Sequence, residues 1–146
     1  MKRYYDTGTL VKLYTVEPES EAVARFVMDK KQAIAVCELH LSEIAAAFRL
    51  KQFRKECSAH QASAALAMVE SDLRSGVLVR VSIEWGAVWE STRKLLDKHA
   101  AKTGCRTMDT LHLACALALE TTEFVTTDRR QAGLATRLGL RVMNPI

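Results

Sequence analysis

The chain has 146 residues, of which 49% are hydrophobic and 26% charged, and its formal net charge is +4. This length and composition predict one globular domain spanning residues 1–146, and the mildly basic charge permits a polyanionic partner. No apolar run approaches the roughly 20 residues of a membrane helix, and the N-terminus lacks a signal-peptide pattern, so we expect a cytoplasmic protein with no membrane partner. The four cysteines include no C-x-x-C pair, which argues against a zinc ribbon or disulfide framework; Cys37 and Cys115 are interpreted as core residues.

Strand-like and helical segments alternate along the chain. In chain order we expect a strand at Arg3–Tyr5, helices at Thr9–Thr15 and Ser20–Lys30, a strand at Ala33–Val36, helices at Glu38–Arg54 and Ser58–Ser75, a strand at Val77–Val81, helices at Glu84–Lys102 and Thr107–Glu120, a strand at Glu123–Thr127, a helix at Arg129–Leu138 and a strand at Leu140–Val142. Ser58 and Ser82 are the expected N-caps, and Gly76 and Gly104 end their helices. This alternation predicts an α/β fold, a three-layer α/β/α sandwich around a parallel sheet of about five strands.

Three acidic residues fall at one edge of such a sheet. Asp6 and Asp128 end strands, and Asp109 lies in the first turn of a helix. The carboxyl ends of parallel strands and the N-termini of the crossover helices share one edge, which is where ligands bind. Topology therefore predicts that these three side chains lie together.

Glu43 is expected to join them from the helix Glu38–Arg54. It falls on a helical stripe whose other members are Leu39, Ala46, Ala47 and Leu50. A carboxylate within an apolar stripe needs a cation or a proton. Four acids gathered at one edge would repel each other unless a divalent metal lay among them, and Mg²⁺ or Mn²⁺ suits an all-oxygen site.

Each acid also has a simpler interpretation. Asp128 could cap the following helix, Asp109 could favour the positive end of its own helix, and Asp6 could start a turn. Glu43 has the weakest simple explanation, because its stripe is expected to face inward. The joint placement of four acids is harder to explain in this way than any one of them.

Four stretches, in this order and spacing, are typical of one family. They are YYDTGTLVKLY (4–14), LSEIAAAFRLK (41–51), CRTMDTLHLACAL (105–117) and FVTTDRRQAGLATRLGLRV (124–142). Together they resemble the PIN-domain ribonucleases, and within these the VapC-like toxins of toxin–antitoxin pairs. The resemblance covers nearly the whole chain.

The resemblance implies a parallel α/β/α fold and an endoribonuclease that cleaves RNA with Mg²⁺ or Mn²⁺. It assigns the metal site to the same four acids, Asp6, Glu43, Asp109 and Asp128. Thr126 corresponds to a hydroxyl that supports this site. The family usually has Ser or Asn where Gly8 stands here, and Thr7 or Thr9 could compensate for the lost hydroxyl. The resemblance also implies a small antitoxin partner and a homodimer, for which the helical surface Ala59–Val69 is a candidate.

In the mechanism that these residues suggest, Asp6, Asp109 and Asp128 hold the metal directly or through water. Glu43 is either a ligand or the group that orients the attacking water. Basic side chains must bring in the RNA. The candidates are Lys12, the run Arg49–Lys55, and Arg129 with Arg130; for any single one, a solvated surface position is the commoner outcome.

Two further features have competing interpretations. His112, one turn after Asp109, could be a general base, but its apolar neighbours favour a core position. Trp85 and Trp89 could stack on bases, although packing or an interface is the more common role.

Two rival functions use similar ingredients. A receiver domain needs a phosphoacceptor Asp after its third strand and a Lys after its fifth, whereas this chain has Val81-Ser82 and Met143-Asn144 there. Alternatively, a catalytically weak PIN-scaffold binding module could act with a partner in RNA binding or transcriptional regulation. The intact acid set argues against that second rival, and Gly8 leaves it open.

Overall fold

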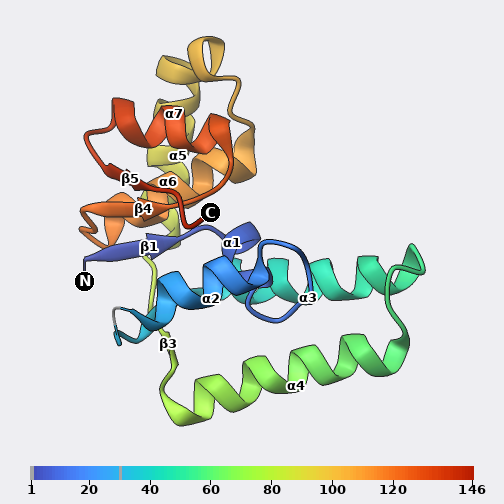
Figure 1. The fold of residues 1–146 in the computed structure, drawn as a ribbon. Coiled ribbons are helices and arrows are strands. Elements are labelled where there is room, and N and C mark those ends of the chain that lie inside the picture. Colours follow the sequence, from blue (N-terminus) through green and yellow to red (C-terminus); the bar gives the residue numbers. More distant parts are fainter. Residues whose placement is uncertain (1, 30) are drawn as a thin grey trace. The chain divides into compact units, whose positions relative to one another are not determined.

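The computed structural model describes residues 2–29 and 31–146, in which seven helices alternate with five strands (Figure 1). The elements in chain order are β1 Arg3–Tyr5, α1 Thr7–Val11, α2 Ser20–Met28, β2 Ile34–Val36, α3 Glu38–Phe53, α4 Ala59–Ser75, β3 Leu78–Arg80, α5 Trp85–Thr103, α6 Thr107–Ala118, β4 Glu123–Val125, α7 Arg129–Arg137 and β5 Arg141–Met143. The chain divides into two compact units, with boundaries after Asp6 and after Val81. The first unit holds β1 and the elements from α5 to β5, and the second holds the elements from α1 to β3.

The α/β fold with parallel strands is confirmed, but the five strands form two ladders. The first unit contains a three-stranded sheet in the order β1-β4-β5, and the second unit contains the pair β2-β3. Both sheets are parallel throughout. Each strand has only three residues, so each ladder contains few hydrogen bonds. The strands of each ladder belong to the same unit.

The strands β1 and β4 of the first unit are buried along their whole length, as expected for strands covered on both faces. The rings of Tyr4 and Phe124, which are opposite each other in the register, stack with centroids 5.5 Å apart. The helices α5, α6 and α7 pack on one another in the same unit, and α7 also contacts β5. This core fixes the carboxyl ends of β1 and β4 side by side.

The same register places one carboxylate among three cations. Glu123 is opposite Arg3 on β1 and Arg141 on β5. Arg3 Nη2 lies 2.9 Å from Glu123 Oε2, while Lys2 Nζ and Arg141 Nη1 lie 3.6 Å and 3.7 Å from Oε1. Burial acts to raise the pKa of Glu123, but the hydrogen bond and charge of Arg3, with the charge of Lys2, outweigh it and lower the pKa below its usual value.

Replacing this carboxylate, as in Glu123→Gln, is expected to destabilise the fold by about 3 kcal/mol at pH 7, because it leaves the buried Arg3 without its counter-charge. A depressed folded-state pKa means that the stabilisation is present above the unfolded pKa and is lost as the pH falls through the folded pKa. The difference in free energy of unfolding between the wild type and Glu123→Gln should therefore become smaller at acidic pH. Urea denaturation at neutral and acidic pH measures both quantities.

The matched control is Glu90→Gln. Glu90 forms an exposed ion pair with Lys94 at 3.2 Å, four residues along α5. Exposed pairs of this kind contribute roughly 0.5 kcal/mol or less. Equal destabilisation by Glu90→Gln and Glu123→Gln would contradict a stabilising role for the buried pair.

The second unit is organised by the parallel pair β2-β3 and by the packing of α3 against α4. The predicted cap of α4 is confirmed, because the Ser58 side chain accepts a hydrogen bond from the Gln61 N–H at 3.0 Å. Gly76 ends the helix with φ +82°, a conformation that favours glycine.

Several expected boundaries differ from the observed ones. The first helix was expected at Thr9–Thr15 but starts at Thr7, because the chain turns directly from β1 into α1 through Asp6 alone. Ser82 does not cap α5; the preceding residue is Glu84, and its side chain makes no capping hydrogen bond. Gly104 does end α5, with φ +71°. The helix expected at Ser20–Lys30 ends at Met28, and Lys30 lies outside the described residues.

Within the described residues, none of the helices combines the length and apolarity needed to span a bilayer.

Candidate functional site

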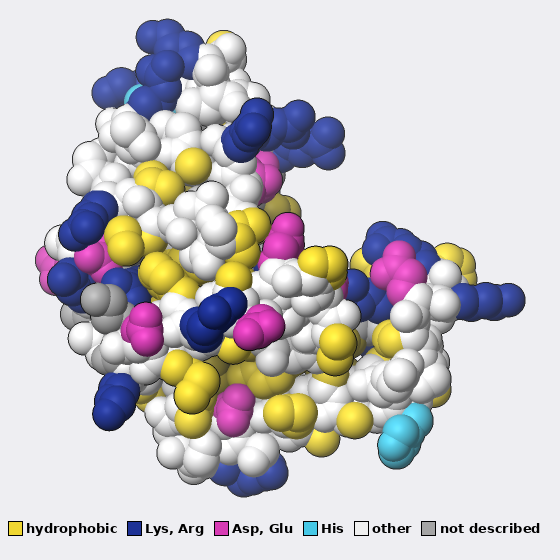
Figure 2. Space-filling model, viewed as in Figure 1, with side chains coloured by type: hydrophobic (Ala, Val, Ile, Leu, Met, Phe, Trp, Pro, Cys, Tyr) yellow, Lys and Arg dark blue, Asp and Glu magenta, His cyan; other side chains and the backbone are white. Residues whose placement is uncertain are grey.

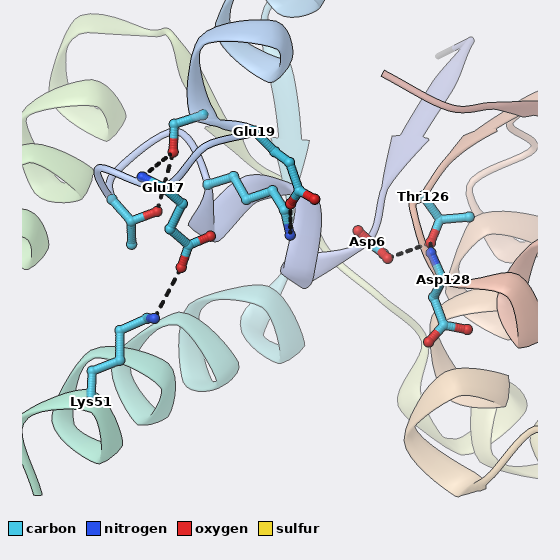
Figure 3. A network of polar contacts seen from close by, with 9 residues as sticks. Asp6, Glu17, Glu19, Lys51, Thr126 and Asp128 are labelled. Carbon is cyan, nitrogen blue, oxygen red and sulfur yellow. Dashed lines mark hydrogen bonds and ion pairs between the residues drawn. The ribbon is translucent and has the colours of Figure 1, made fainter. Parts of the chain in front are cut away.

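The carboxylate of Asp6 lies at the carboxyl end of β1 in the first unit. The ladder continues to this residue, since the Asp6 N–H donates to the Val125 carbonyl at 3.0 Å. The residue is 5% exposed, and its Oδ2 accepts a hydrogen bond from the Thr126 hydroxyl at 2.5 Å (Figure 3). The Asp6 carboxylate is therefore held by a hydroxyl from a residue 120 positions away in the sequence.

The Thr126 hydroxyl has three polar contacts but can donate only one hydrogen bond. It accepts the Asp128 N–H at 3.0 Å, and it lies 2.5 Å from Asp6 Oδ2 and 3.1 Å from Gln131 Oε1. A hydroxyl has one donor and two acceptor lone pairs, and the shorter contact to a carboxylate takes the proton. Rotating the Gln131 amide by half a turn makes its nitrogen the donor to Thr126. The hydroxyl is then fully paired and points at Asp6.

Asp128 caps α7, as the simpler interpretation proposed. Its Oδ1 accepts the Gln131 N–H at 2.8 Å, while the residue as a whole is exposed. The cap uses one oxygen, so the other is left outside the cap. The capping role and a ligand role are therefore compatible in one carboxylate.

Asp109 has the equivalent arrangement on α6. It is the third residue of the helix, and its Oδ2 accepts the Arg106 N–H at 3.1 Å, again using one oxygen. Both Asp109 and Asp128 thus lie at helix N-termini, where the positive end of the helix dipole favours an anion.

Cys105 connects these two helix starts, a role that the sequence did not reveal. Its thiol donates to the Arg130 carbonyl at 3.1 Å, which ties the residue before the α6 cap to the first turn of α7. Burial raises the pKa of the Cys105 thiol, and the charges of Asp109 and Asp128 raise it further. Both carboxylates therefore lie close enough to act on one sulfur atom. No spacing or motif marked this cysteine, because the pairing is with a backbone carbonyl distant in sequence.

Glu43 belongs to the second unit, on α3. Its Oε1 accepts a hydrogen bond at 2.8 Å from the hydroxyl of Thr7, the first residue of α1, so the expected support from Thr7 goes to Glu43. The residue is half-buried.

The apolar stripe expected around Glu43 is wrong in part. The buried residues of α3 are Leu39, His40, Ile44 and Phe48. Ala46 and Leu50 are exposed, so Glu43 lies at the margin of the buried face. His40 takes a core position because its Nδ1 accepts the Cys37 N–H at 3.0 Å, which satisfies a polar ring inside the core.

No three His, Cys, Asp or Glu side chains among residues 2–29 and 31–146 converge closely enough to hold a metal ion in the arrangement described. The donor chemistry nevertheless fits a hard cation. Asp6 is aimed by a hydroxyl, and Asp109 and Asp128 are each anchored through one oxygen, which leaves carboxylate oxygens of the kind that Mg²⁺ and Mn²⁺ prefer.

The expected RNA-binding cations differ in their surroundings. Lys12 lies just beyond the end of α1, is 17% exposed in its side chain and pairs with Glu19 at 3.5 Å. Lys51 pairs with Glu17 at 3.1 Å, as Figure 3 shows. Arg129 and Arg130, in contrast, are exposed at the start of α7 in the first unit.

The core interpretation of His112 is confirmed. The residue is 3% exposed, and its Nδ1 lies 2.7 Å from the Tyr4 hydroxyl. Cys37 and Cys115 are likewise fully buried. Trp89 is 42% exposed on α5 and Trp85 is half-buried.

Comparison with known proteins identifies a family. The family model described as the PIN domain matches residues 3–136. No curated protein matches the sequence significantly.

Solved structures share the fold at low sequence identity. DNA-bound VapBC from Salmonella typhimurium has 15% identity and a TM-score of 0.68, with 100% of this chain and 99% of that chain covered. VapBC2 from Rickettsia felis, bound to a promoter DNA fragment, has 18% identity and a TM-score of 0.65, with 99% and 98% covered. VapC20 of Mycobacterium tuberculosis, described as a sarcin-ricin loop cleaving toxin, has 15% identity and a TM-score of 0.63, with 90% and 94% covered.

Proposed function

Because the chain belongs to the PIN-domain family, whose members are typically ribonucleases, we propose that it is a metal-dependent endoribonuclease. The observation that carries this proposal is the support of three carboxylates in the first unit: Asp6 by the Thr126 hydroxyl, and Asp109 and Asp128 by helix N-termini. Side chains anchored in this way keep ligand oxygens in place. The proposal treats residues 1–146 as one PIN-like domain.

In the proposed mechanism Asp6, Asp109 and Asp128 hold Mg²⁺ or Mn²⁺, directly or through water. When bound, such an ion lowers the pKa of a water molecule and neutralises charge on the scissile phosphate. Thr126 keeps Asp6 oriented by donating its hydroxyl proton to the Asp6 carboxylate. Glu43, held by Thr7, is the fourth acid, either as a ligand or as the group that orients the attacking water. Arg129 and Arg130 offset the repulsion between these acids and RNA.

We further propose that the enzyme is the toxin of a toxin–antitoxin pair. The support is that the structural neighbours include VapBC complexes bound to DNA, and a VapC toxin described as cleaving the sarcin-ricin loop. A small antitoxin protein is then the expected partner, and a homodimer the expected assembly.

The test is RNA cleavage by the purified protein, freed of any partner. Total cellular RNA incubated with Mg²⁺ or Mn²⁺ should yield discrete fragments, and mapping their 5′ ends identifies the target. If no RNA is cut with either ion, the ribonuclease proposal is refuted, and the binding module that Gly8 leaves open is the remaining alternative.

Removing the Thr126 hydroxyl, as in Thr126→Val, is expected to lower the cleavage rate about 10- to 100-fold, because Asp6 loses the group that orients it. Initial rates at saturating metal measure this effect. Thr126→Ser keeps the hydroxyl and should remain near wild type. If Ser and Val variants lose the same activity, the hydroxyl does not position Asp6.

A further inference from the structure

Four cations in the first unit lie along two packed helices. Lys98 and Lys102 belong to α5, and Arg130 and Arg137 belong to α7. All four are exposed, and none forms an ion pair with another residue in the described part of the chain. Figure 2 shows Lys and Arg side chains gathered at the end of this unit that carries the turn between α5 and α6. These four residues are called the α5–α7 strip.

The two helices run antiparallel, which orders the four cations. Gly104, just after α5, lies against Arg130 at the start of α7, so that an added methyl group would meet Arg130 Nε at 3.8 Å. Earlier on α5, His99 lies close enough to Arg137, at the end of α7, for the arginine charge to lower the pKa of the imidazole. Arg130 and Arg137 are seven residues apart, which is about 10 Å along a helix. The strip therefore leads away from the Asp128 end of α7.

The imidazole of His99 lies within reach of the charges of three of these cations. Its partial burial and the charges of Lys98, Arg137 and Lys102 lower the pKa of its imidazole below the usual value. Three cations therefore act on one ring, and the excess positive potential favours a bound anion. Asp128, at the N-terminal end of α7, repels anions. The four cations of the strip attract them, so a polyanion is expected to bind along the strip.

We propose that the α5–α7 strip binds the phosphate backbone of single-stranded RNA that flanks the scissile bond. This inference rests on the proposed ribonuclease function and adds to it the path of the substrate. The proposed contacts are between Lys and Arg side chains and phosphate oxygens, so the strip contributes to affinity and register rather than to sequence choice.

The test measures binding of a labelled single-stranded oligouridine to the full chain in an Asp6→Asn background, which separates binding from cleavage. Lys98→Ala and Lys102→Ala are each expected to raise the dissociation constant about fivefold at moderate salt. Each should also reduce the slope of log K against log salt by about 0.7, the value for one lost phosphate contact on a single strand.

The matched control is Lys94→Ala, which removes the same charge from the same helix. Lys94 already pairs with Glu90 at 3.2 Å, so its loss should change neither quantity. The pKa of His99, followed by NMR, gives a readout independent of catalysis. It should rise when Arg137 is replaced by Ala, and it should also rise in the Asp6→Asn protein when oligouridine binds.

The outcomes separate the two proposals. If the wild-type chain cuts RNA but Lys98→Ala and Lys102→Ala bind oligouridine like Lys94→Ala, the strip is refuted and the ribonuclease function stands. If the wild-type chain cuts no RNA, the proposed function fails. An unchanged His99 pKa in saturating oligouridine would also overturn the strip.

Discussion

Asp6→Asn is expected to lower the rate of RNA cleavage by roughly a thousandfold or more, about 4 kcal/mol of transition-state stabilisation. Asn keeps the shape of the side chain and can still accept the Thr126 hydroxyl, so the buried edge of β1 should remain folded. What it loses is the negative charge that a divalent cation requires. Initial rates with a labelled RNA at saturating Mg²⁺, together with circular dichroism of the variant, measure the two expectations.

Asp97→Asn provides the control for this experiment. Asp97 is exposed on α5, and Asp97→Asn changes the net charge by the same amount as Asp6→Asn. It should cut RNA at the wild-type rate. Cleavage by Asp6→Asn at the rate of Asp97→Asn would remove Asp6 from the catalytic site.

Removal of divalent metal with EDTA is expected to reduce cleavage to the level of Asp6→Asn. Carboxylate oxygens alone cannot neutralise the phosphate, and without the ion they repel it. Adding excess Mg²⁺ or Mn²⁺ should restore the rate, which shows that the loss is not denaturation. The measurement is the cleavage rate as a function of free metal concentration.

The contrary result is equally clear. Cleavage that persists in EDTA in the wild type, and is absent from a parallel Asp6→Asn preparation, would mean that Asp6 acts without a divalent ion. Persistence in both preparations would point to a contaminating nuclease and is excluded by repurification.

The strands and helices were largely predictable because the apolar runs and the glycine C-caps are local signals. Gly76 and Gly104 end their helices as expected, and the ends of β1 and β4 lead to Asp6 and Asp128. Asp109 also takes its expected place at a helix N-terminus. Local periodicity was enough for these features.

The buried face of α3 could not be read from the pattern. Alanine is small enough to fit either face of a helix, so Ala46 did not distinguish an inward from an outward stripe. His40 was not marked as a core residue from the sequence, because the hydrogen bond with the Cys37 N–H that makes burial of the ring tolerable leaves no pattern in the sequence.

Polar contacts between residues distant in sequence could not be predicted from the sequence either. The contact of Arg3 with Glu123 joins residues 120 positions apart, and that of Cys105 with Arg130 ends on a backbone atom. Neither leaves a periodic signal in the sequence. The division of the strands into two ladders also joins residues that are far apart in the sequence, such as Tyr4 and Phe124.

The most direct test of the metal site is a Mn²⁺ titration followed by electron paramagnetic resonance, without RNA. We predict that the wild type and Asp97→Asn bind Mn²⁺ alike, and that Asp6→Asn and Asp109→Asn each bind it at least about tenfold more weakly. Equal Mn²⁺ affinity in all four proteins would contradict the claim that these carboxylates share one divalent ion.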